Sequence, residues 1–307
     1  MCTGKDYTAM GMDIRLLRYF LAVCEEGNIS QAARSLYITQ PTLSRQIAEF
    51  EREIGSQLFI RKGRQMMLTD KGVYLQSRAR EILSLVQNTE EELKTNDEIL
   101  AGTIHIAAGE SWALQPLAAL IREFREQYPE VTFAVHTGNG EDVAMRIELG
   151  LADFGVFMGK HKHADYEVLT FQATDTWGLI MPEDAPLAQQ ESITVEDLCD
   201  LPLVASEGTL DHGDLATWLN PIRNHLNIAC TYTLAYNAAM LVIEHVGYAV
   251  TFDRIIATNK GSGLVFRPLA PAVTSPVEFA WKQGQHLSHA ARAFLEIVHS
   301  SDIVRHK

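Results

Sequence analysis

Cysteine is scarce in this 307-residue sequence, and long apolar runs are missing from it. The four cysteines, Cys2, Cys24, Cys199 and Cys230, form no CxxC pair, which disfavours a disulfide framework or a zinc site. Buried free thiols are favoured over a redox pair of Cys199 and Cys230. No apolar run approaches the roughly 20 residues of a membrane span, and residues 1–11 lack the apolar core of a signal peptide. The sequence therefore predicts a cytoplasmic protein without a membrane segment, and it assigns no role to residues 1–11.

Familiar catalytic motifs are also missing. The sequence has no GxSxG, Walker loop, HExxH or complete GxGxxG. His161 and His163 stand in a polar stretch without partners at metal-ligand spacing, and His212 beside Asp211 has no neighbouring nucleophile. Both stretches are expected to be surface loops. We therefore expect neither an enzyme nor a bound metal or cofactor.

Positive charge is scarce overall but unevenly distributed. The formal net charge is −13, yet residues 1–80 hold 12 Lys and Arg against 8 Asp and Glu. The rest of the chain holds 14 against 31. The length allows two or three domains, and the asymmetry predicts a modestly basic N-terminal module followed by an acidic body.

Three short helices are expected in the basic module. Apolar residues recur at helical spacing along residues 14–25, and Gly27 ends that run. Ser30 is expected to cap a shorter second helix, in which the small Ala32 and Ala33 allow two helices to cross closely. The expected helices span residues 14–25, 31–36 and 40–54.

The third helix combines an apolar face with a polar one. Thr39 is a good N-cap, and Pro41 falls in the first turn, where its missing N–H is harmless. The apolar face consists of Leu43, Ile47, Phe50 and Ile54. The opposite face consists of Gln40, Thr42, Ser44, Arg45 and Gln46. Because Arg and Gln pair bidentately with guanine and adenine edges, and a helix N-terminus favours phosphate, this face is typical of a DNA-recognition helix. The polar face of an ordinary three-helix core is the alternative.

A basic hairpin is expected directly after these helices. Residues 59–69 read as two short strands with Gly63 at the turn. A basic-tipped hairpin behind a helix-turn-helix is a wing, which contacts the DNA backbone or the minor groove. A solvated basic loop is the alternative. The basic side chains of the wing are Arg61, Lys62 and Arg64.

The segment from Ala32 to Gly72, AARSLYITQPTLSRQIAEFEREIGSQLFIRKGRQMMLTDKG, resembles the winged helix-turn-helix of the LysR-type transcriptional regulators. Ile29, Phe50 and Ile54 depart from the family pattern but stay apolar. The resemblance implies that the third helix faces the major groove and that the wing holds DNA. The predicted DNA-binding residues are Thr39, Gln40, Pro41, Thr42, Ser44, Arg45, Arg61, Lys62 and Arg64.

A long helix without internal proline is expected from residue 70 to about residue 95, capped by Thr69. At about 1.5 Å per residue it would be about 39 Å long. Self-pairing of its apolar seam predicts a dimer, and a helix packed on its own chain is the alternative. The resemblance implies the same linker helix, with dimers or tetramers. The predicted seam residues are Leu75, Ala79, Ile82, Val86 and Leu93.

Beyond residue 100, predicted strands and helices alternate, which implies a parallel sheet with flanking helices. Strands are expected over residues 103–108, 131–137, 154–158, 176–181, 203–205, 248–252 and 277–281, and helices over residues 112–127, 142–149, 215–226, 237–246 and 289–299. Two α/β halves joined by two crossings resemble the effector domain of the same family, which is similar to periplasmic solute-binding proteins. The predicted fold is thus α+β and multidomain. It has a winged helix-turn-helix over residues 12–70, a linker helix and hinge over 71–100, and a two-lobed effector domain over 101–307. Lobe one covers about 103–180 and 282–307, and lobe two about 181–281.

Ligands of such folds lie between the halves, at the carboxyl ends of strands and near helix N-termini. Capping by Ser111 or Ser206, and burial of Trp112, are alternatives to ligand binding. With Glu110 facing Glu207 the cleft would be anionic, which favours a neutral, polyol-like or cationic effector over a carboxylate. The predicted effector-binding residues are Gly109, Glu110, Ser111, Trp112, Asn139, Phe157, Ser206, Glu207, Thr209, Tyr236 and Asn237.

These features predict a sequence-specific DNA-binding regulator of the LysR type, working as a homodimer or homotetramer on operator DNA. A small effector would close the lobes, and so change DNA bending and contact with RNA polymerase. The alternative is a cytoplasmic solute-binding or enzymatic protein whose N-terminal helices serve assembly alone.

Overall fold

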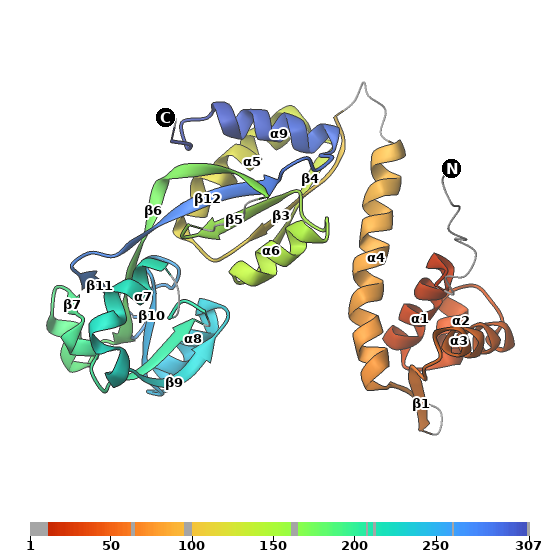
Figure 1. Ribbon diagram of the computed structural model, residues 1–307, viewed down its shortest axis with the longest axis horizontal. Coiled ribbons are helices and arrows are strands. Elements are labelled where there is room, and N and C mark those ends of the chain that lie inside the picture. The colour runs from red at the N-terminus through yellow and green to blue at the C-terminus, as the bar shows by residue number, and fades with distance from the viewer. Residues whose placement is uncertain are drawn as a thin grey trace, which may run out of the picture. The chain divides into compact units, whose positions relative to one another are not determined.

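The structure, a computed structural model, describes residues 12–62, 65–94, 100–160, 165–206, 208–210, 213–259 and 261–305. The chain divides into two compact units, Met1–Lys94 and Thr95–Lys307 (Figure 1). The helix that was predicted as a separate linker over residues 71–100 therefore groups with the N-terminal unit. The reason is that its first turns pack on the core of that unit.

The N-terminal unit contains the three predicted helices, the predicted hairpin and the long helix. The hairpin tip, Gly63 and Arg64, lies outside the described residues. The elements are α1 (Ile14–Glu26), α2 (Ile29–Ser35), α3 (Gln40–Ile54), β1 (Phe59–Lys62), β2 (Gln65–Leu68) and α4 (Asp70–Lys94).

Local side chains set the ends of these helices. Gly27 ends α1 in the left-handed conformation, at a φ of 58°, which glycine adopts without steric cost. Thr39 caps α3 as predicted, accepting a hydrogen bond from the Thr42 N–H. The prediction for Ser30 was wrong. Asn28 is the N-cap of α2, and its Oδ1 accepts from the N–H of Ser30 at 2.8 Å, because an extended Asn reaches the N–H groups two and three residues ahead.

Aromatic rings form the centre of this unit. The Phe20 ring lies 6.4 Å from that of Phe50 and 5.2 Å from that of Phe59, so α1, α3 and the wing share one core. Ala32 and Ala33 are buried there, which confirms that small residues stand where the helices meet. Burial of these rings, at about 25 cal/mol per Å² of apolar area, fixes the orientation of α3.

The seam predicted on α4 is corrected in its first half. Leu75 is buried and Ala79 has no exposed surface, and both belong to the core of their own unit. A spacing of four and three residues also suits a helix lying on its own domain, so the pattern could not separate the two arrangements. Ile82 is 38% exposed and Val86 is half-buried. The Leu93 side chain lies outside the described residues.

The C-terminal unit is built on a 10-stranded sheet in which helices cover the strands. Its elements are β3 (Gly102–Ala108), η2 (Trp112–Leu114), α5 (Gln115–Gln127), β4 (Val131–Thr137), α6 (Gly140–Glu148), β5 (Phe154–Met158), β6 (Tyr166–Pro182), η3 (Pro186–Gln189), β7 (Ile193–Thr194), η4 (Glu196–Leu198), β8 (Pro202–Ser206), α7 (Gly213–Leu219), η5 (Asn220–His225), β9 (Asn227–Tyr232), α8 (Ala235–Ile243), β10 (Tyr248–Phe252), β11 (Leu264–Ala270), β12 (Thr274–Lys282) and α9 (His289–Ser300). The parallel pairing of β3 with β4 and β5 confirms the predicted βαβαβ order.

The long strand β6 runs through both lobes, and the chain crosses back to lobe one just before β12. The first part of β6, up to Thr176, pairs with β12, whereas the part from Trp177 pairs with β10 and β11. The predicted lobe boundaries are therefore corrected: lobe one comprises residues 100–176 and 274–305, and lobe two comprises residues 177–273. The sequence pattern hid this division, because only the apolar second half of β6 stood out as a strand.

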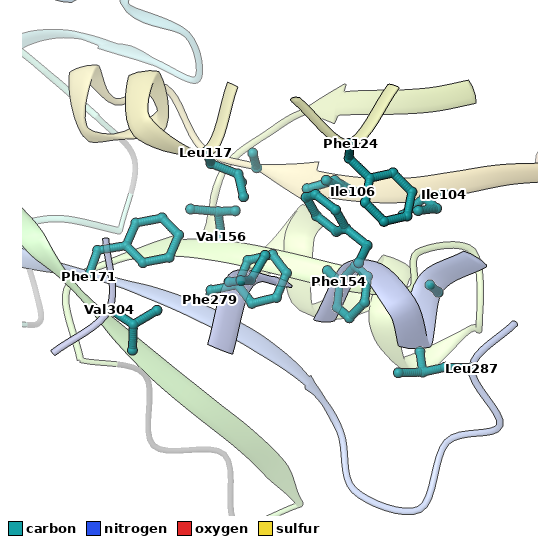
Figure 2. Packing of buried hydrophobic residues seen from close by; sticks show 14 of the residues in the cluster. Ile104, Ile106, Leu117, Phe124, Phe154, Val156, Phe171, Phe279, Leu287 and Val304 are labelled. Carbon is teal, nitrogen blue, oxygen red and sulfur yellow. The ribbon is translucent and has the colours of Figure 1, made fainter. Parts of the chain in front are cut away.

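The core of lobe one lies between its sheet and the helices α5 and α9, which lie together on one face of it (Figure 1). Figure 2 shows Phe154 and Phe279 in this core, with ring centroids 4.8 Å apart. Helix α6 covers the opposite face, where Ala107 and Phe157 point. The alternation of Ile106 and Ala107 between the two faces is the period of two expected of a strand covered on both sides.

Candidate nucleic-acid interface and effector cleft

The polar edge of α3 lies on the surface of the N-terminal unit. Gln40, Pro41 and Arg45 are exposed, and Thr42 and Ser44 are half-buried. The opposite face buries Leu43, Ile47 and Phe50. The structure therefore leaves the predicted recognition residues free of the core that holds their helix.

The N-terminus of α3 is well capped. Thr39 Oγ1 lies 2.8 Å from Thr42 Oγ1, and it also accepts from the Thr42 N–H at 3.4 Å. Helix N-termini carry a partial positive charge and unpaired N–H groups, which attract phosphate. The exposed Gln40 and Arg45 stand beside this end of the helix, so phosphate binding and base contacts would come from one edge.

The wing and the recognition helix meet through two predicted residues. The Arg61 Nη2 in β1 donates a hydrogen bond to Ser44 Oγ in α3 at 3.2 Å. Lys62 is exposed next to Arg61. Arg64, which was predicted with them, lies outside the described residues. The structure thus joins Ser44 and Arg61 directly, and it leaves the neighbouring Arg45 and Lys62 exposed.

A carboxylate that was not predicted as a site residue holds the wing in place. Glu51 Oε1 in α3 accepts hydrogen bonds from the N–H groups of Leu58 at 2.7 Å and Phe59 at 2.9 Å. On the other strand, the Met66 N–H donates to the Gly27 carbonyl at 2.8 Å. Glu51 lies in the segment that resembles the LysR-type regulators, but a role for it could not follow from spacing, because its partners lie seven and eight residues further along.

In the C-terminal unit, Glu110 joins the two lobes. It follows β3 in lobe one, and its Oε2 accepts a hydrogen bond from the Ala235 N–H at 2.5 Å, at the first residue of α8 in lobe two. The predicted facing residue, Glu207, lies outside the described residues. The structure therefore shows that the Glu110 carboxylate has a partner within the chain, on the other lobe, and its contact with an effector stays a prediction.

Ser111 has the capping role that the sequence offered as the alternative to effector binding, and it also bonds to a residue of β6. Its Oγ accepts from the Ala113 N–H at 2.9 Å, which makes it the N-cap of η2. Its hydroxyl donates to Asp175 Oδ2 at 2.6 Å. Asp175 is only 2% exposed, and burial raises the pKa of its carboxyl, although the Ser111 bond and the charge of Arg254 oppose this.

Trp112 belongs to the cleft surface rather than to the core. Its side chain is 46% exposed, so the alternative of burial was wrong. The Arg254 guanidinium, from the loop after β10 in lobe two, lies 5.2 Å from the centre of the Trp112 ring, in cation–π range. Arg254 also pairs with Asp253 at 3.3 Å. A second contact between the lobes thus lies close to Glu110 in sequence.

Two further buried hydrogen bonds were not predicted. Trp177 Nε1 donates to the buried Ser275 Oγ at 2.9 Å, at the point where β6 enters lobe two and β12 begins. The Tyr232 hydroxyl donates to the Val250 carbonyl at 2.9 Å. Burial, with a contribution from the Glu110 charge, raises the pKa of Tyr232 to about 12. The sequence offered one sign that the crossing of β6 is unusual: Asp175 is an acidic residue inside an otherwise strand-forming run.

Some predicted effector residues are placed elsewhere. Phe157 is 1% exposed and packs under α6, because β5 turns it to the face away from the cleft; that prediction was wrong. Asn139 is the N-cap of α6 in a capping box with Asp142, so its amide is engaged in the helix end. Gly109 packs closely against Met158: a Cβ at this position would lie 2.5 Å from Met158 Sδ. The close packing accounts for a glycine here without a ligand.

The remaining predicted effector residues lie in lobe two. Thr209 Oγ1 donates to the Ser206 carbonyl at 2.8 Å, closing a turn after β8. Tyr236 and Asn237 are exposed in the first turn of α8, next to Ala235. The structure thus places Tyr236 and Asn237 beside the residue that Glu110 contacts, and their contact with an effector stays a prediction.

Metal-binding clusters and membrane-spanning helices are both absent from the described residues. Within the described ranges, no group of three or more His, Cys, Asp or Glu side chains is placed to hold a metal ion. Among the same residues, no helix has the length and hydropathy needed to span a membrane. His161, His163, Asp211 and His212 lie outside the described part of the chain.

Comparison with known proteins gives two family matches. Residues 14–73 match the bacterial regulatory helix-turn-helix protein, lysR family, and residues 98–302 match the LysR substrate binding domain. The first match covers α1 to the start of α4, and the second covers the two lobes. The whole described architecture, apart from part of α4, is thus accounted for by one family.

Individual proteins agree with this assignment. A probable RuBisCO transcriptional regulator of Cyanophora paradoxa is 35% identical over 191 residues, which is 62% of this chain and 59% of that protein. The uncharacterized HTH-type transcriptional regulator YvbU of Bacillus subtilis (strain 168) is 26% identical over 93% of this chain and 97% of its own length. The crystal structure of full-length CbnR complexed with its target DNA has a TM-score of 0.70 at 20% identity, covering 94% of this chain and 99% of that one, which shows the shared fold. The chain therefore belongs to the LysR family of transcriptional regulators.

Proposed function

We propose that this protein binds double-stranded operator DNA in a sequence-specific manner and regulates transcription in response to a small effector. The observation that supports this most is the exposed edge of α3, joined to the wing by the Arg61–Ser44 hydrogen bond. An α-helix fits the major groove, and a basic wing beside it adds phosphate contacts. CbnR, with which the chain shares its fold, has been solved with its target DNA.

Within this proposal, Arg45 reads a base edge and Arg61 and Lys62 bind the backbone. Replacing Arg45 with Ala should cost about 1–3 kcal/mol on the preferred sequence and relax the preference at one base pair. Replacing Arg61 with Ala should instead weaken binding to all sequences to a similar degree, and should lower the dependence of binding on salt by about one unit of slope. A mobility-shift titration against single-base variants of a bound operator, repeated at several salt concentrations, measures both effects.

Arg52 provides the matched control. It lies in the last turn of the same helix and is exposed, so Arg52→Ala removes the same charge far along α3 from the Gln40–Arg45 edge. We expect Arg52→Ala to keep the wild-type preference. An Arg45→Ala protein that selects as sharply as Arg52→Ala would contradict the assignment of this edge.

We further propose that the effector is neutral, polyol-like or cationic. Three acids lie at or next to the contacts of the Glu110–Trp112 segment: Glu110 bonds to Ala235, Asp175 bonds to Ser111, and Asp253 pairs with Arg254, which also contacts Trp112. The N-terminus of α8, where an effector carboxylate would be most stable, is occupied by Glu110. Calorimetric titration with matched sets of polyols, amines and dicarboxylates tests this, and tight binding of a dicarboxylate would contradict it.

The proposed active species is a homodimer or homotetramer. A two-fold assembly matches an inverted-repeat operator, since each subunit then reads one half-site. The exposed Ile82 and Leu85 on α4 are the apolar residues proposed to meet a second copy. Altered assembly would change DNA bending and contact with RNA polymerase. We propose a cytoplasmic location and no enzymatic activity, in keeping with a family of transcriptional regulators.

A further inference from the structure

Three consecutive residues after β3 contact three different elements. Glu110 bonds to the first residue of α8, Ser111 bonds to Asp175 on β6, and Trp112 lies against Arg254. The first and third of these contacts join lobe one to lobe two. The segment Glu110–Trp112 is therefore a bridge across the cleft, formed within one chain.

The Glu110 carboxylate provides the N-terminal cap that the residues next to α8 in sequence do not provide. Leu234, at the N-cap, is apolar and has no side-chain oxygen to accept the N–H groups of the first turn. The first turn of α8 also lacks an acidic residue. The carboxylate that caps this helix comes instead from a residue 125 positions earlier in the chain. Its negative charge is stabilised by the partial positive charge of the helix end.

Ser111, the middle residue of the bridge, attaches the segment to lobe one. Ser111 is held on two sides, by the Ala113 N–H and by Asp175, and Asp175 lies in β6 just before that strand enters lobe two. Glu110 and Trp112 thus start from a fixed point on lobe one. Arg254, on the other side, has a φ of 63°, and its backbone follows the end of β10. The two cross-lobe contacts therefore depend on the separation of the lobes.

We propose that Glu110 is an interlobe latch: its carboxylate caps α8 and holds the cleft closed when no effector is bound. The inference rests on the effector control proposed above, but it reverses the expected direction of the change: the effector does not close the lobes but releases the contact that holds them together. A cationic or polyol effector gives the Glu110 carboxylate a new partner, which removes the cap from α8 and frees the two lobes to move. Because the open and closed arrangements differ by this contact, a ligand that pairs with Glu110 shifts their populations.

The test uses the full-length protein without DNA or effector. Spin labels are placed on two exposed residues, Glu126 on α5 in lobe one and Glu196 on η4 in lobe two, after the native cysteines have been replaced by serine. Labelled protein is diluted with unlabelled protein, so that the distances measured lie within one chain. Hydrogen exchange of the Ala235 amide is followed in parallel on unlabelled protein.

Glu110→Ala should broaden the distribution of interlobe distances and speed Ala235 exchange about tenfold, which corresponds to about 1.4 kcal/mol. Sodium formate should restore both properties towards wild type in this variant, because it supplies a free carboxylate for the end of α8, whereas sodium chloride at equal ionic strength should not. Glu110→Gln, which keeps the shape and an acceptor oxygen, should fall between wild type and Glu110→Ala. If the Ala variant fails to fold, the intermediate exchange of the Gln variant is the result that decides.

Glu141→Ala is the matched control, because Glu141 is an exposed acid in the first turn of α6 within lobe one. It should leave the interlobe distances and the Ala235 exchange unchanged. The proposal is overturned if Glu110→Ala or Glu110→Gln matches wild type in both measurements, or if formate acts on wild type as strongly as on Glu110→Ala. The interlobe distances and the Ala235 exchange are measured without DNA. A failure of the latch proposal can therefore be told apart from a failure of the proposed DNA-binding function.

Discussion

Replacing Glu51 with Ala should loosen the wing of the N-terminal unit. The Glu51 carboxylate accepts two backbone hydrogen bonds, from Leu58 at 2.7 Å and from Phe59 at 2.9 Å. Both partners have buried side chains at the start of β1, which leaves their N–H groups little access to water. The alanine variant therefore leaves two donors unpaired where the wing leaves the core.

The size of the effect follows from the two bonds. A hydrogen bond to a charged group contributes about 1.5–3 kcal/mol. Because Glu51 is half-buried, loss of both bonds in Glu51→Ala should lower the free energy of unfolding of this unit by about 3 kcal/mol. Glu51→Gln keeps one acceptor oxygen and should cost about 1 kcal/mol. Because β1 carries Arg61 and Lys62, the alanine variant should also bind DNA more weakly across all sequences.

Urea unfolding separates the two units of the full-length protein. All four tryptophans lie at residue 112 or beyond, so their fluorescence reports the C-terminal unit, whereas loss of far-UV helical signal includes both. Glu51→Ala should shift the helical transition to lower urea and leave the fluorescence transition in place, with faster amide exchange at Leu58 and Phe59. Glu53→Ala, an exposed acid on the same helix, should stay within about 0.5 kcal/mol of wild type. Equal helical transitions and equal amide exchange in Glu51→Ala and Glu53→Ala would contradict this role of Glu51.

Three further predictions concern other positions. Burial raises the pKa of Cys24 to about 12, so iodoacetamide at pH 8 should modify Cys24 far more slowly than Cys199, as mass spectrometry of digests can show; equal rates would contradict it. The raised pKa of Asp175 means that folding favours its protonated form, so wild type should lose stability relative to Asp175→Asn as the pH rises from about 4 to 7 in urea titrations followed by fluorescence. A Cβ at Gly72 would lie 2.2 Å from the Leu58 carbonyl oxygen, a backbone atom, so Gly72→Ala should lower the stability of the N-terminal unit by at least about 1–3 kcal/mol, and an unchanged far-UV transition would contradict this.

The sequence was most informative where local chemistry decides the structure. Thr39 before Pro41, and Gly27 after a run of helical apolar spacing, were sufficient to place the ends of α3 and α1. Strands β4, β5 and β10 have the predicted bounds, because each is a short apolar or alternating run between breaks. In α2, two capping residues competed, and Asn28 was favoured over Ser30.

The features that the sequence did not predict depend on contacts between distant parts of the chain. Leu75 and Ala79 fit a helix seam and a domain core equally well, and periodicity alone does not say which surface covers them. The first half of β6 carries polar residues such as Asp175, so it lacked an apolar pattern, although it pairs with β12 along its length. Glu110 was predicted in the cleft, but its partner, 125 residues away, could be found only from the fold.

Selection of DNA fragments is the sharpest measure of whether the exposed edge of α3 reads DNA sequence. Fragments of the source genome are selected by the full-length protein, in parallel with Arg45→Ala and Arg52→Ala. We expect wild type and Arg52→Ala to enrich the same small set of fragments sharing an inverted repeat, and Arg45→Ala to enrich a broader set. Enrichment of one set of fragments by all three proteins, or of none by wild type, would contradict it.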